Sequence, residues 1–318
     1  MATIRPNLRR AEIKPEQPKR SSLRMKDNVA AYLLIFPNMA VFFLWVLLPV
    51  IFTFFLSFTE WNFLEGIDNV RFSGVDNYRN LMDDPWFTDS MINTTLYTIV
   101  VVPVTMALGL FFALLLDKQV YLPVIPRILI FIPYITSPVA IAAIWMTLFS
   151  PNWGPINVFL FDTFGIEDPP TWFASSTWAL PALMIVTIWK GIGYNALIYL
   201  AGLQSIPESL YEVAAIDGAG WWTRFKSVTL PLLSPTTFFL GITGVMTSFR
   251  VFELVAVITQ GGPGTSTTVI AYSIYRAGFS FYRMGYASAM AVIMLIIVIT
   301  FTYVQWRIQQ RQTRFMRD

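Results

Sequence analysis

The 318-residue chain contains neither histidine nor cysteine. It therefore lacks imidazole bases, thiol nucleophiles, disulfides and the nitrogen and sulfur ligands of common metal sites. A Gly-x-Ser-x-Gly setting for a nucleophilic serine is also absent. These absences exclude most catalytic constellations, so we expect a protein that is not an enzyme and has no metal site.

Three ionisable residues, Lys190, Arg250 and Glu253, fall within or near long apolar stretches. A Lys or Arg at the centre of a membrane helix costs roughly 2.5–3.5 kcal/mol, so such residues usually face a bundle interior or a water-filled cavity. Two alternatives are open. Arg250 and Glu253 are three residues apart and could neutralise each other, and Lys190 could extend to the outer interface.

Polar residues accompany these charges at helical spacing, which places them on shared helix faces. Hydroxyl, amide and aromatic groups of this kind suit a sugar, whose OH and C–H surfaces they can contact. The alternative is helix packing through small residues, which we favour for Gly241. The first stripe is Thr187, Lys190, Gly191 and Tyr194, and the second is Thr236, Thr243, Thr247 and Arg250, with Gly244 and Ser248 beside it.

The composition indicates an integral membrane protein. Hydrophobic residues make up 55% of the chain and charged residues 13%, whereas soluble domains carry about 25% charge. Six stretches are long enough to cross a bilayer as helices. We expect an all-α protein with a six-span domain over residues 29–307, with spans near Val29–Phe58, Met91–Leu116, Ile128–Phe149, Trp178–Leu203, Pro235–Ile258 and Tyr286–Trp306.

Lys and Arg are distributed unevenly between the two sides that six spans define. Sixteen lie in the N-terminal tail, the second and fourth loops and the C-terminus, including Lys118 and Arg127, against four on the other side. The positive-inside rule therefore predicts that both termini are cytoplasmic. We expect residues 1–28 to form a disordered basic tail and 308–318 a second cytoplasmic tail. No basic stripe interleaved with aromatic residues indicates nucleic-acid binding.

Prolines and tryptophans mark further features of the spans. We expect prolines to interrupt helices in the second and third spans, where neighbouring protein must satisfy the freed backbone groups. Tryptophans near the span ends are typical of an aromatic belt at the membrane surface. The prolines are Pro103, Pro126, Pro133 and Pro138, and the tryptophans are Trp61, Trp86, Trp153 and Trp172.

The fourth loop, residues 205–231, has the local signals of two short helices. Ser205 and Glu208 fit a capping box, and Gly218 is placed to end the first helix in a left-handed conformation. A second helix would run from Trp221 to Val228. Its large apolar residues, which include Trp222 and Phe225, could lie in the membrane interface or dock into a groove on a partner.

This loop resembles the EAA loop of membrane subunits of binding-protein-dependent ABC importers. That pattern is Glu-Ala-Ala, three residues, Gly, nine residues and Ile-x-Leu-Pro. Here it reads Glu212-Val213-Ala214, Gly218 and Val228-x-Leu230-Pro231, with Val213 and Val228 as conservative departures. The segments Phe131–Asn157, Trp189–Pro207 and Thr259–Thr267 are similar to segments of sugar and glycerol-3-phosphate permeases.

The resemblance implies a type I ABC importer permease in the bacterial inner membrane. Its partners would be a second homologous permease, a dimer of ATPase subunits and an external substrate-binding protein, and the ATPase alone would bind ATP. The loop would be the coupling helix that docks on the ATPase, through Glu212, Ala214, Ala215, Asp217, Gly218 and Ala219. A substrate cavity would be lined at Lys190, Gly191, Tyr194, Gly244, Thr247, Ser248 and Val251, beside Arg250.

Two other functions stay open. A glycerol-3-phosphate or related phospho-ester importer would use Lys190 and Arg250 to bind the anion. An ion-coupled secondary transporter would need acidic residues within the spans, and Glu253 is the one available. Gly261–Thr267 (GGPGTST) resembles a phosphate-binding loop but has no lysine, so it does not fit the Walker pattern.

Overall fold

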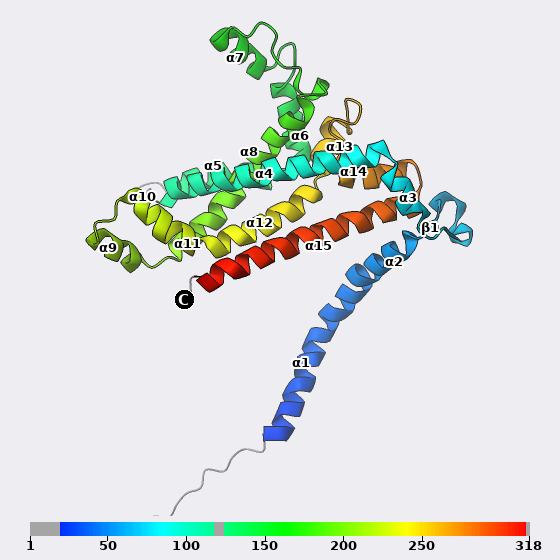
Figure 1. Ribbon diagram of the computed structural model, residues 1–318, viewed down its shortest axis with the longest axis horizontal. Coiled ribbons are helices and arrows are strands. Elements are labelled where there is room, and N and C mark those ends of the chain that lie inside the picture. Colours follow the sequence, from blue (N-terminus) through cyan, green and yellow to red (C-terminus); the bar gives the residue numbers. More distant parts are fainter. Residues whose placement is uncertain (1–19, 118–123, 316–318) are drawn as a thin grey trace, which may run out of the picture. The chain divides into compact units, whose positions relative to one another are not determined.

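The computed structural model describes residues 20–117 and 124–315, which are mostly helical, and the chain divides into two compact units, Met1–Phe52 and Thr53–Asp318 (Figure 1). Residues 1–19 of the tail predicted over residues 1–28 lie outside the described residues, as do Lys118 and residues 316–318. Residues 20–28 of that tail form the start of helix α1 (Arg20–Phe42).

The first unit contains α1, the π-helical turn η1 (Phe43–Leu47) and most of α2 (Leu48–Leu56). Residues Ala31–Leu56 have a mean hydropathy of 2.6 in their most apolar window. A helix that is apolar on all sides is typical of a membrane span. The wider turn immediately precedes Pro49, which has no N–H to donate to the carbonyl of Trp45.

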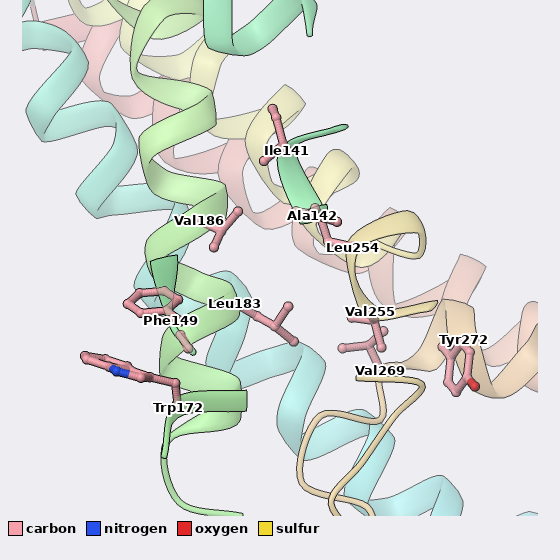
Figure 2. Packing of buried hydrophobic residues seen from close by; sticks show 11 residues of the cluster. Ile141, Ala142, Phe149, Trp172, Leu183, Val186, Leu254, Val255, Val269 and Tyr272 are labelled. Carbon is pink, nitrogen blue, oxygen red and sulfur yellow. The ribbon is translucent and has the colours of Figure 1, made fainter. Parts of the chain in front are cut away.

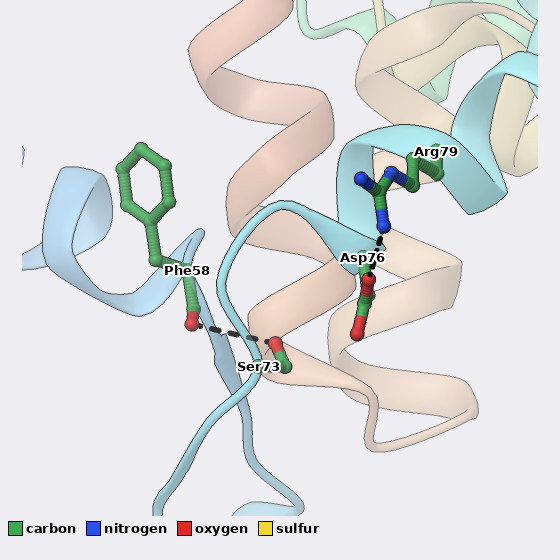
Figure 3. Close-up of polar contacts among 4 residues, drawn as sticks. All are labelled: Phe58, Ser73, Asp76 and Arg79. Atoms are coloured by element: carbon green, nitrogen blue, oxygen red, sulfur yellow. Dashed lines mark hydrogen bonds and ion pairs between the residues drawn. The ribbon is translucent and has the colours of Figure 1, made fainter.

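The second unit begins with a small hairpin that follows the end of α2. Strands β1 (Thr59–Glu60) and β2 (Arg71–Phe72) pair antiparallel, and the turns η2 (Phe63–Glu65) and η3 (Ile67–Asn69) connect them. The Phe58 carbonyl accepts from the Ser73 hydroxyl at 3.3 Å, and Arg79 pairs with Asp76 on α3 (Asp76–Met82) (Figure 3).

The long helices of this unit run side by side in Figure 1. Five helices among the described residues are long and apolar enough to cross a membrane, and a bent pair makes a sixth, in agreement with the predicted all-α, six-span fold. The spans of the second unit are α4 (Pro85–Asp117), the pair α5 (Val124–Ile135) and α6 (Pro138–Leu148), α8 (Ala179–Gln204), α12 (Ser234–Phe249) with α13 (Glu253–Ile258), and α15 (Met284–Phe315).

Shorter elements connect these spans. The connection from α6 to α8 contains α7 (Pro155–Phe164) and η4 (Trp172–Ala174). The segment between α8 and α12, called the coupling segment after the loop that it resembles, contains α9 (Glu208–Ile216), α10 (Trp221–Arg224), η5 (Phe225–Thr229) and α11 (Leu230–Leu232). The elements α14 (Ile270–Tyr275) and η6 (Arg276–Ser280) precede α15.

The prolines interrupt fewer helices than predicted. Pro138 begins α6 after a 97° bend, as expected for a residue that tolerates the first turn of a helix. Pro103 and Pro133 lie inside continuous helices, so that prediction was wrong for them. Pro126 lies in the first turn of α5, where its missing N–H has no intrahelical acceptor to lose.

Two further boundaries differ from the prediction. The fifth span is interrupted at residues 250–252, between α12 and α13. The last helix continues to Phe315, into the predicted cytoplasmic tail, because neither glycine nor proline follows Gly285 to end it.

A buried cluster joins α6, α8 and α13 with the segment before α14 (Figure 2). Phe149 stacks on Trp172 with ring centroids 4.2 Å apart, and the indole N–H of Trp172 donates to Asn157 Oδ1 at 2.6 Å. Trp172 is thus a core residue and not part of a membrane-surface belt, because both its ring and its N–H are satisfied inside the protein. Trp153, by contrast, is exposed.

Glycines allow the spans to approach closely. A Cβ on Gly193 of α8 would lie 2.1 Å from the carbonyl oxygen of Ile130 in α5. A Cβ on Gly191 would lie 2.8 Å from the Thr105 methyl of α4, and one on Gly244 of α12 would lie 2.9 Å from Val102. Small residues at contacts of this kind are typical of packed membrane helices.

Candidate functional site

A cavity of about 660 Å³ lies between α4, α8 and α12, closed further by residues of α5, α6 and α13. The structure brings all eight predicted cavity residues together on its wall. They are Lys190, Gly191, Tyr194, Gly244, Thr247, Ser248, Arg250 and Val251. The size fits a small organic solute, and the part of these residues in binding one stays a prediction.

The α8 wall follows the helical spacing on which the prediction depended. Thr187, Lys190, Gly191 and Tyr194 all line the cavity, because residues three, four and seven apart share a helix face. Thr187 accepts a 2.6 Å hydrogen bond from Tyr97 of α4, and its own hydroxyl donates to the Leu183 carbonyl. This wall is therefore fixed to α4 by a hydrogen bond as well as by packing.

The α12 wall presents hydroxyl groups. Thr243 and Thr247 donate to carbonyls one turn earlier in their own helix, at 2.9–3.2 Å. Their remaining oxygen lone pairs are hydrogen-bond acceptors, which suits solute OH groups as donors. Thr236 of the predicted stripe is not on this wall, since it lies against Gly202 nearer the coupling segment, and Gly241 faces Gln305 of α15.

The charged residues are arranged differently from the pairing considered for them. Arg250 and Glu253, both described and both exposed, form no ion pair with each other. Lys190 lies near the middle of α8 and not at its end, and it lines the same cavity as Arg250 and Glu253. The interruption of the helix at residues 250–252 explains why Arg250 and Glu253 are not paired, because it removes the three-residue spacing that joins side chains on a continuous helix.

Sequence reasoning missed Tyr134, Asn195 and the α4 part of the wall. Tyr134 of α5 stacks on Tyr194 of α8 with centroids 4.8 Å apart. Asn195, next to Tyr194, also lines the cavity. Its position beside the predicted polar stripe could have indicated it from the sequence. The α4 residues Val101, Val102, Thr105 and Met106 also line the cavity, and sequence reasoning did not select them because α4 carries no charge in this part.

The coupling segment contains a tight turn at the predicted glycine. Gly218 has φ +78°, its N–H donates to the Ala215 carbonyl at 3.1 Å, and the Ala219 N–H donates to the Ala214 carbonyl at 2.9 Å. This pattern is the Schellman motif that ends helices at a left-handed glycine. Glu212, Ala215, Asp217 and Gly218 are exposed, while Ala214 and Ala219 are half-buried.

The predicted capping box does not form. Ser205 is the last residue of the α8 region, and its hydroxyl donates to the Gly202 carbonyl at 2.7 Å. Helix α9 begins at Glu208 behind Pro207, without a side-chain cap. The hydroxyl therefore bonds to a carbonyl at the end of one helix and does not reach the N–H groups that begin the next.

The second part of the segment is helical from Trp221 to Leu232, longer than predicted. Trp221 and Phe225 have nearly parallel rings 5.7 Å apart, and Trp222 is 65% exposed. The Tyr211 and Thr229 hydroxyls are 3.0 Å apart, and the Arg224 side chain donates to the Ala219 carbonyl. The first contact joins α9 to η5, and the second joins α10 to the turn that precedes it.

The segment Gly261–Thr267 forms a cross-linked loop. Thr267 donates to the Gly262 carbonyl and to Thr259, while Asn93 of α4 donates to the carbonyls of Thr265 and Thr268. The Thr265 and Thr267 hydroxyls are used in bonds within the protein, whereas the buried Ser266 hydroxyl has no hydrogen-bond partner among the described residues.

Comparison with known proteins identifies the family. The family model described as "Binding-protein-dependent transport system inner membrane component" matches residues 24–314. The chain belongs to this family. It is therefore a multi-pass inner-membrane transport component, and a substrate-binding protein is among its partners.

Several relatives of this permease cover nearly the whole chain. It is 37% identical to the sulfoquinovosyl glycerol transport permease SmoG of Agrobacterium fabrum, over 90% of this chain and 92% of that protein. It is 34% identical to the sn-glycerol-3-phosphate permease UgpA of Pectobacterium atrosepticum (89% and 95%). It is 33% identical to the trehalose/maltose permease MalF of Thermococcus litoralis (94% and 98%).

A solved structure is similar to this permease in fold. A chain of a bacterial alginate ABC transporter, in complex with a periplasmic protein that holds an alginate pentasaccharide, superimposes with a TM-score of 0.78. The two chains are 23% identical, and the match covers 92% of this chain and 98% of the other. The predicted ABC importer permease fold is thereby confirmed.

Proposed function

We propose that this permease moves a sugar, oligosaccharide or related polyol through the inner membrane as part of an ATP-driven importer. Support comes from the cavity wall, which combines hydroxyl groups of α12 with the Tyr134–Tyr194 pair and Asn195. Hydroxyls and amides match the OH groups of a carbohydrate, and aromatic faces match its C–H surfaces. The names of three relatives are those of sugar or glycerol-ester permeases.

The observation that carries the proposal is the position of the cavity relative to the coupling segment. Helix α8, which carries one wall, leads directly into the segment, and α12, which carries the opposite wall, leaves it (Figure 1). Lys190 is 14 residues from the end of α8, about 21 Å along the helix. Movement of the segment is thus transmitted to the cavity through two rigid helices.

The energy for this movement would come from partner subunits. In this proposal the exposed surface around Glu212 and Gly218 docks on one subunit of an ATPase dimer, and a second homologous permease supplies the other half of the pathway. The exposure of Glu212, Asp217 and Gly218 supports the docking. ATP binds to the ATPase, and the permease itself carries no cofactor.

The coupling segment must then face the cytoplasm, together with both termini. The excess of Lys and Arg on that side supports this orientation. Because the chain has no cysteine, single cysteines at Glu65 and Glu212 can be labelled selectively in intact cells. A membrane-impermeant maleimide should label Glu65→Cys and not Glu212→Cys, and the reverse result would contradict the orientation.

The central test is reconstitution of the complex that copurifies with the full-length permease. We expect an ATPase, a second permease and a substrate-binding protein in the complex, and carbohydrate uptake into proteoliposomes that stops when ATP is omitted. Mass spectrometry of the solute on the binding protein should find a carbohydrate. Uptake that persists without ATP and follows an ion gradient would instead favour the secondary transporter.

A further inference from the structure

Thr105 is an exception among the buried hydroxyl groups of α4. Ser90, Thr94 and Thr98 lie on the same buried face of the helix, and each donates to a carbonyl three or four residues earlier, at 2.6–2.7 Å. Thr105 is also buried, with 6% of its surface exposed, but its hydroxyl has no hydrogen-bond partner among the described residues. Burying a hydroxyl group without a partner is unfavourable, so this position needs an explanation.

The cavity provides one. Thr105 lines it, whereas Ser90, Thr94 and Thr98 do not. The Thr105 methyl group faces Gly191 of α8, at 2.8 Å from the place that a Cβ would take, and the hydroxyl oxygen is 3.9 Å from the same place. Threonine has two χ1 rotamers available in a helix, and the change from one to the other turns the hydroxyl without moving the backbone. A molecule in the cavity can therefore supply the partner that the chain does not.

Asn195 of α8 contributes a second polar group to the same part of the wall, and it also lines the cavity. Its side-chain N–H donates to the Gly191 carbonyl at 3.0 Å, and its Oδ1 accepts no hydrogen bond from any residue that the structure describes. An amide oxygen can only accept. Asn195 thus offers the cavity an acceptor, and Thr105 offers it a hydroxyl.

Two glycines bring these groups together at the contact between α4 and α8. Thr105 lies against Gly191, and a Cβ on Gly109 would lie 2.4 Å from the Asn195 Cβ. Gly109 comes one turn after Thr105, and Asn195 comes one turn after Gly191, so Thr105 and Asn195 are about 6 Å apart along the helices. A single oxygen atom between their side chains can bond to both. Asn195 also directly follows Tyr194, which stacks on Tyr134.

We propose that Thr105 and Asn195 form a subsite that selects one hydroxyl group of the transported solute. The Thr105 hydroxyl donates to the solute oxygen, and Asn195 Oδ1 accepts from the solute O–H. A hydroxyl is the group that fits, because the same oxygen accepts one hydrogen bond and donates another. This inference rests on the proposed function and names the residues that discriminate between solutes at the α4–α8 wall.

The test is ATP-dependent uptake by the reconstituted complex with its own binding protein. The probes are maltose, trehalose and sn-glycerol 3-phosphate, and the variants are compared on each probe that the wild type imports. Thr105→Val keeps the shape of the side chain without the hydroxyl, and it should lower uptake about tenfold or more, as expected for a site that bonds a substrate OH. Thr105→Ser keeps the hydroxyl and should retain most of the uptake.

A second substitution tests whether the two residues bond the same group. Asn195→Leu removes the acceptor and should lower uptake about as much as Thr105→Val. The double variant Thr105→Val/Asn195→Leu should be no worse than the more affected single variant, because residues that share one partner are not additive.

Thr98→Val is the matched control. It makes the same change on the same face of α4, at a hydroxyl that bonds to the Thr94 carbonyl away from the cavity, and it should leave uptake within about twofold of the wild type. Thr105→Val removes no hydrogen bond within the chain, so its unfolding midpoint should stay at or above that of the wild type. Each variant is compared at equal incorporation of the complex.

Monodeoxy derivatives of the imported probe test the contact from the solute side, with the binding protein saturated by each solute. The wild type should import one of these derivatives about tenfold more slowly than the parent compound. Thr105→Val should import that derivative and the parent at rates within about twofold of each other, because the group that recognises the missing hydroxyl is gone.

The outcomes distinguish the two proposals. Uptake by Thr105→Val within twofold of the wild type, or equal losses in Thr105→Val and Thr98→Val, would overturn the inference and leave carbohydrate transport standing. Additive losses in the double variant would also overturn it, because the two residues would then act at separate places. ATP-dependent uptake of a solute that is neither a carbohydrate nor a polyol, with none of the three probes taken up, would contradict the proposed function itself.

Discussion

Helix α8 and the coupling segment use glycine for different physical reasons. On the side of α8 that packs on α5, a Cβ at Gly193 would lie 2.1 Å from a backbone oxygen, so the constraint is space. In the coupling segment, Gly218 has no atom within 4 Å of a Cβ position, and its constraint is the backbone angle of +78°. Gly193 is thus packed against a neighbouring helix, whereas Gly218 has open space around its Cβ position.

Because of this difference, substitutions in the two regions should change different measured quantities. A substitution in the packed wall changes the free energy of folding, because the neighbouring helix must move. A substitution at the exposed turn leaves the packing alone and changes the shape of a surface. Stability and transport should therefore respond separately to the same kind of change in the two regions.

The largest effect is expected for Gly193→Ala. The added methyl group would overlap the Ile130 carbonyl, so α5 and α8 must separate, and overpacking of this kind costs about 1–3 kcal/mol. Thermal unfolding in detergent should show a clearly lower midpoint and a lower yield of monodisperse protein. Gly220→Ala is the control, since Gly220 has φ −68° and open space around it. Equal unfolding midpoints for Gly193→Ala and Gly220→Ala would contradict the distinction between a packed and an exposed glycine.

Gly218→Val should affect transport and not folding. A β-branched residue in the left-handed region costs roughly 1–2 kcal/mol, which shifts the turn from its docking conformation by a factor of about 5–30. ATP-dependent uptake should fall by that factor while the unfolding midpoint stays near that of the wild type. Gly220→Val should retain uptake. An unfolding midpoint that falls as far as in Gly193→Ala would contradict the distinction.

Tyr97→Phe tests the hydrogen bond that fixes α4 to the cavity wall. The change removes the 2.6 Å bond to Thr187 and keeps the ring, and losing a buried hydrogen bond costs about 1 kcal/mol. We expect a small decrease in the unfolding midpoint. Tyr275→Phe, an exposed tyrosine with its ring near Phe252 and Phe279, is the matched control.

The smallest effect is expected for Lys190 and Glu253, which both line the cavity. The double variant Lys190→Met/Glu253→Gln should lose less stability than the sum of the losses in the two single variants, with a coupling energy on the order of 0.5 kcal/mol. A double-mutant cycle on the unfolding midpoints measures it. Strict additivity would show that the Lys190 and Glu253 side chains do not interact.

Much of the site could be predicted because helical periodicity connects sequence to space. Lys190, Gly191 and Tyr194 share a face in any continuous helix. A glycine at position 218 can end α9 in the left-handed conformation without steric cost. The family pattern supplied Glu212 and the spacing to Leu230. These features depend on residues close together in the chain.

The features that were missed depend on distant contacts or on ambiguous local signals. The interruption at residues 250–252 contains no proline or glycine to reveal it. Trp172 was placed in a surface belt because its partners, Phe149 and Asn157, are distant in sequence. Ser205 fits a helix start as well as a helix end, and only the length of α8 decides between them.

The 97° bend before Pro138 divides the third span into two pieces with different neighbours. Helix α5 packs on α8, whereas α6 packs on α13. Tyr134 and Pro138, on either side of the bend, both face the cavity. A small change of angle at Thr136–Ser137 would therefore move Tyr134 relative to Pro138 and change the width of the cavity. The hydrogen bonds within α5 and within α6 would stay intact.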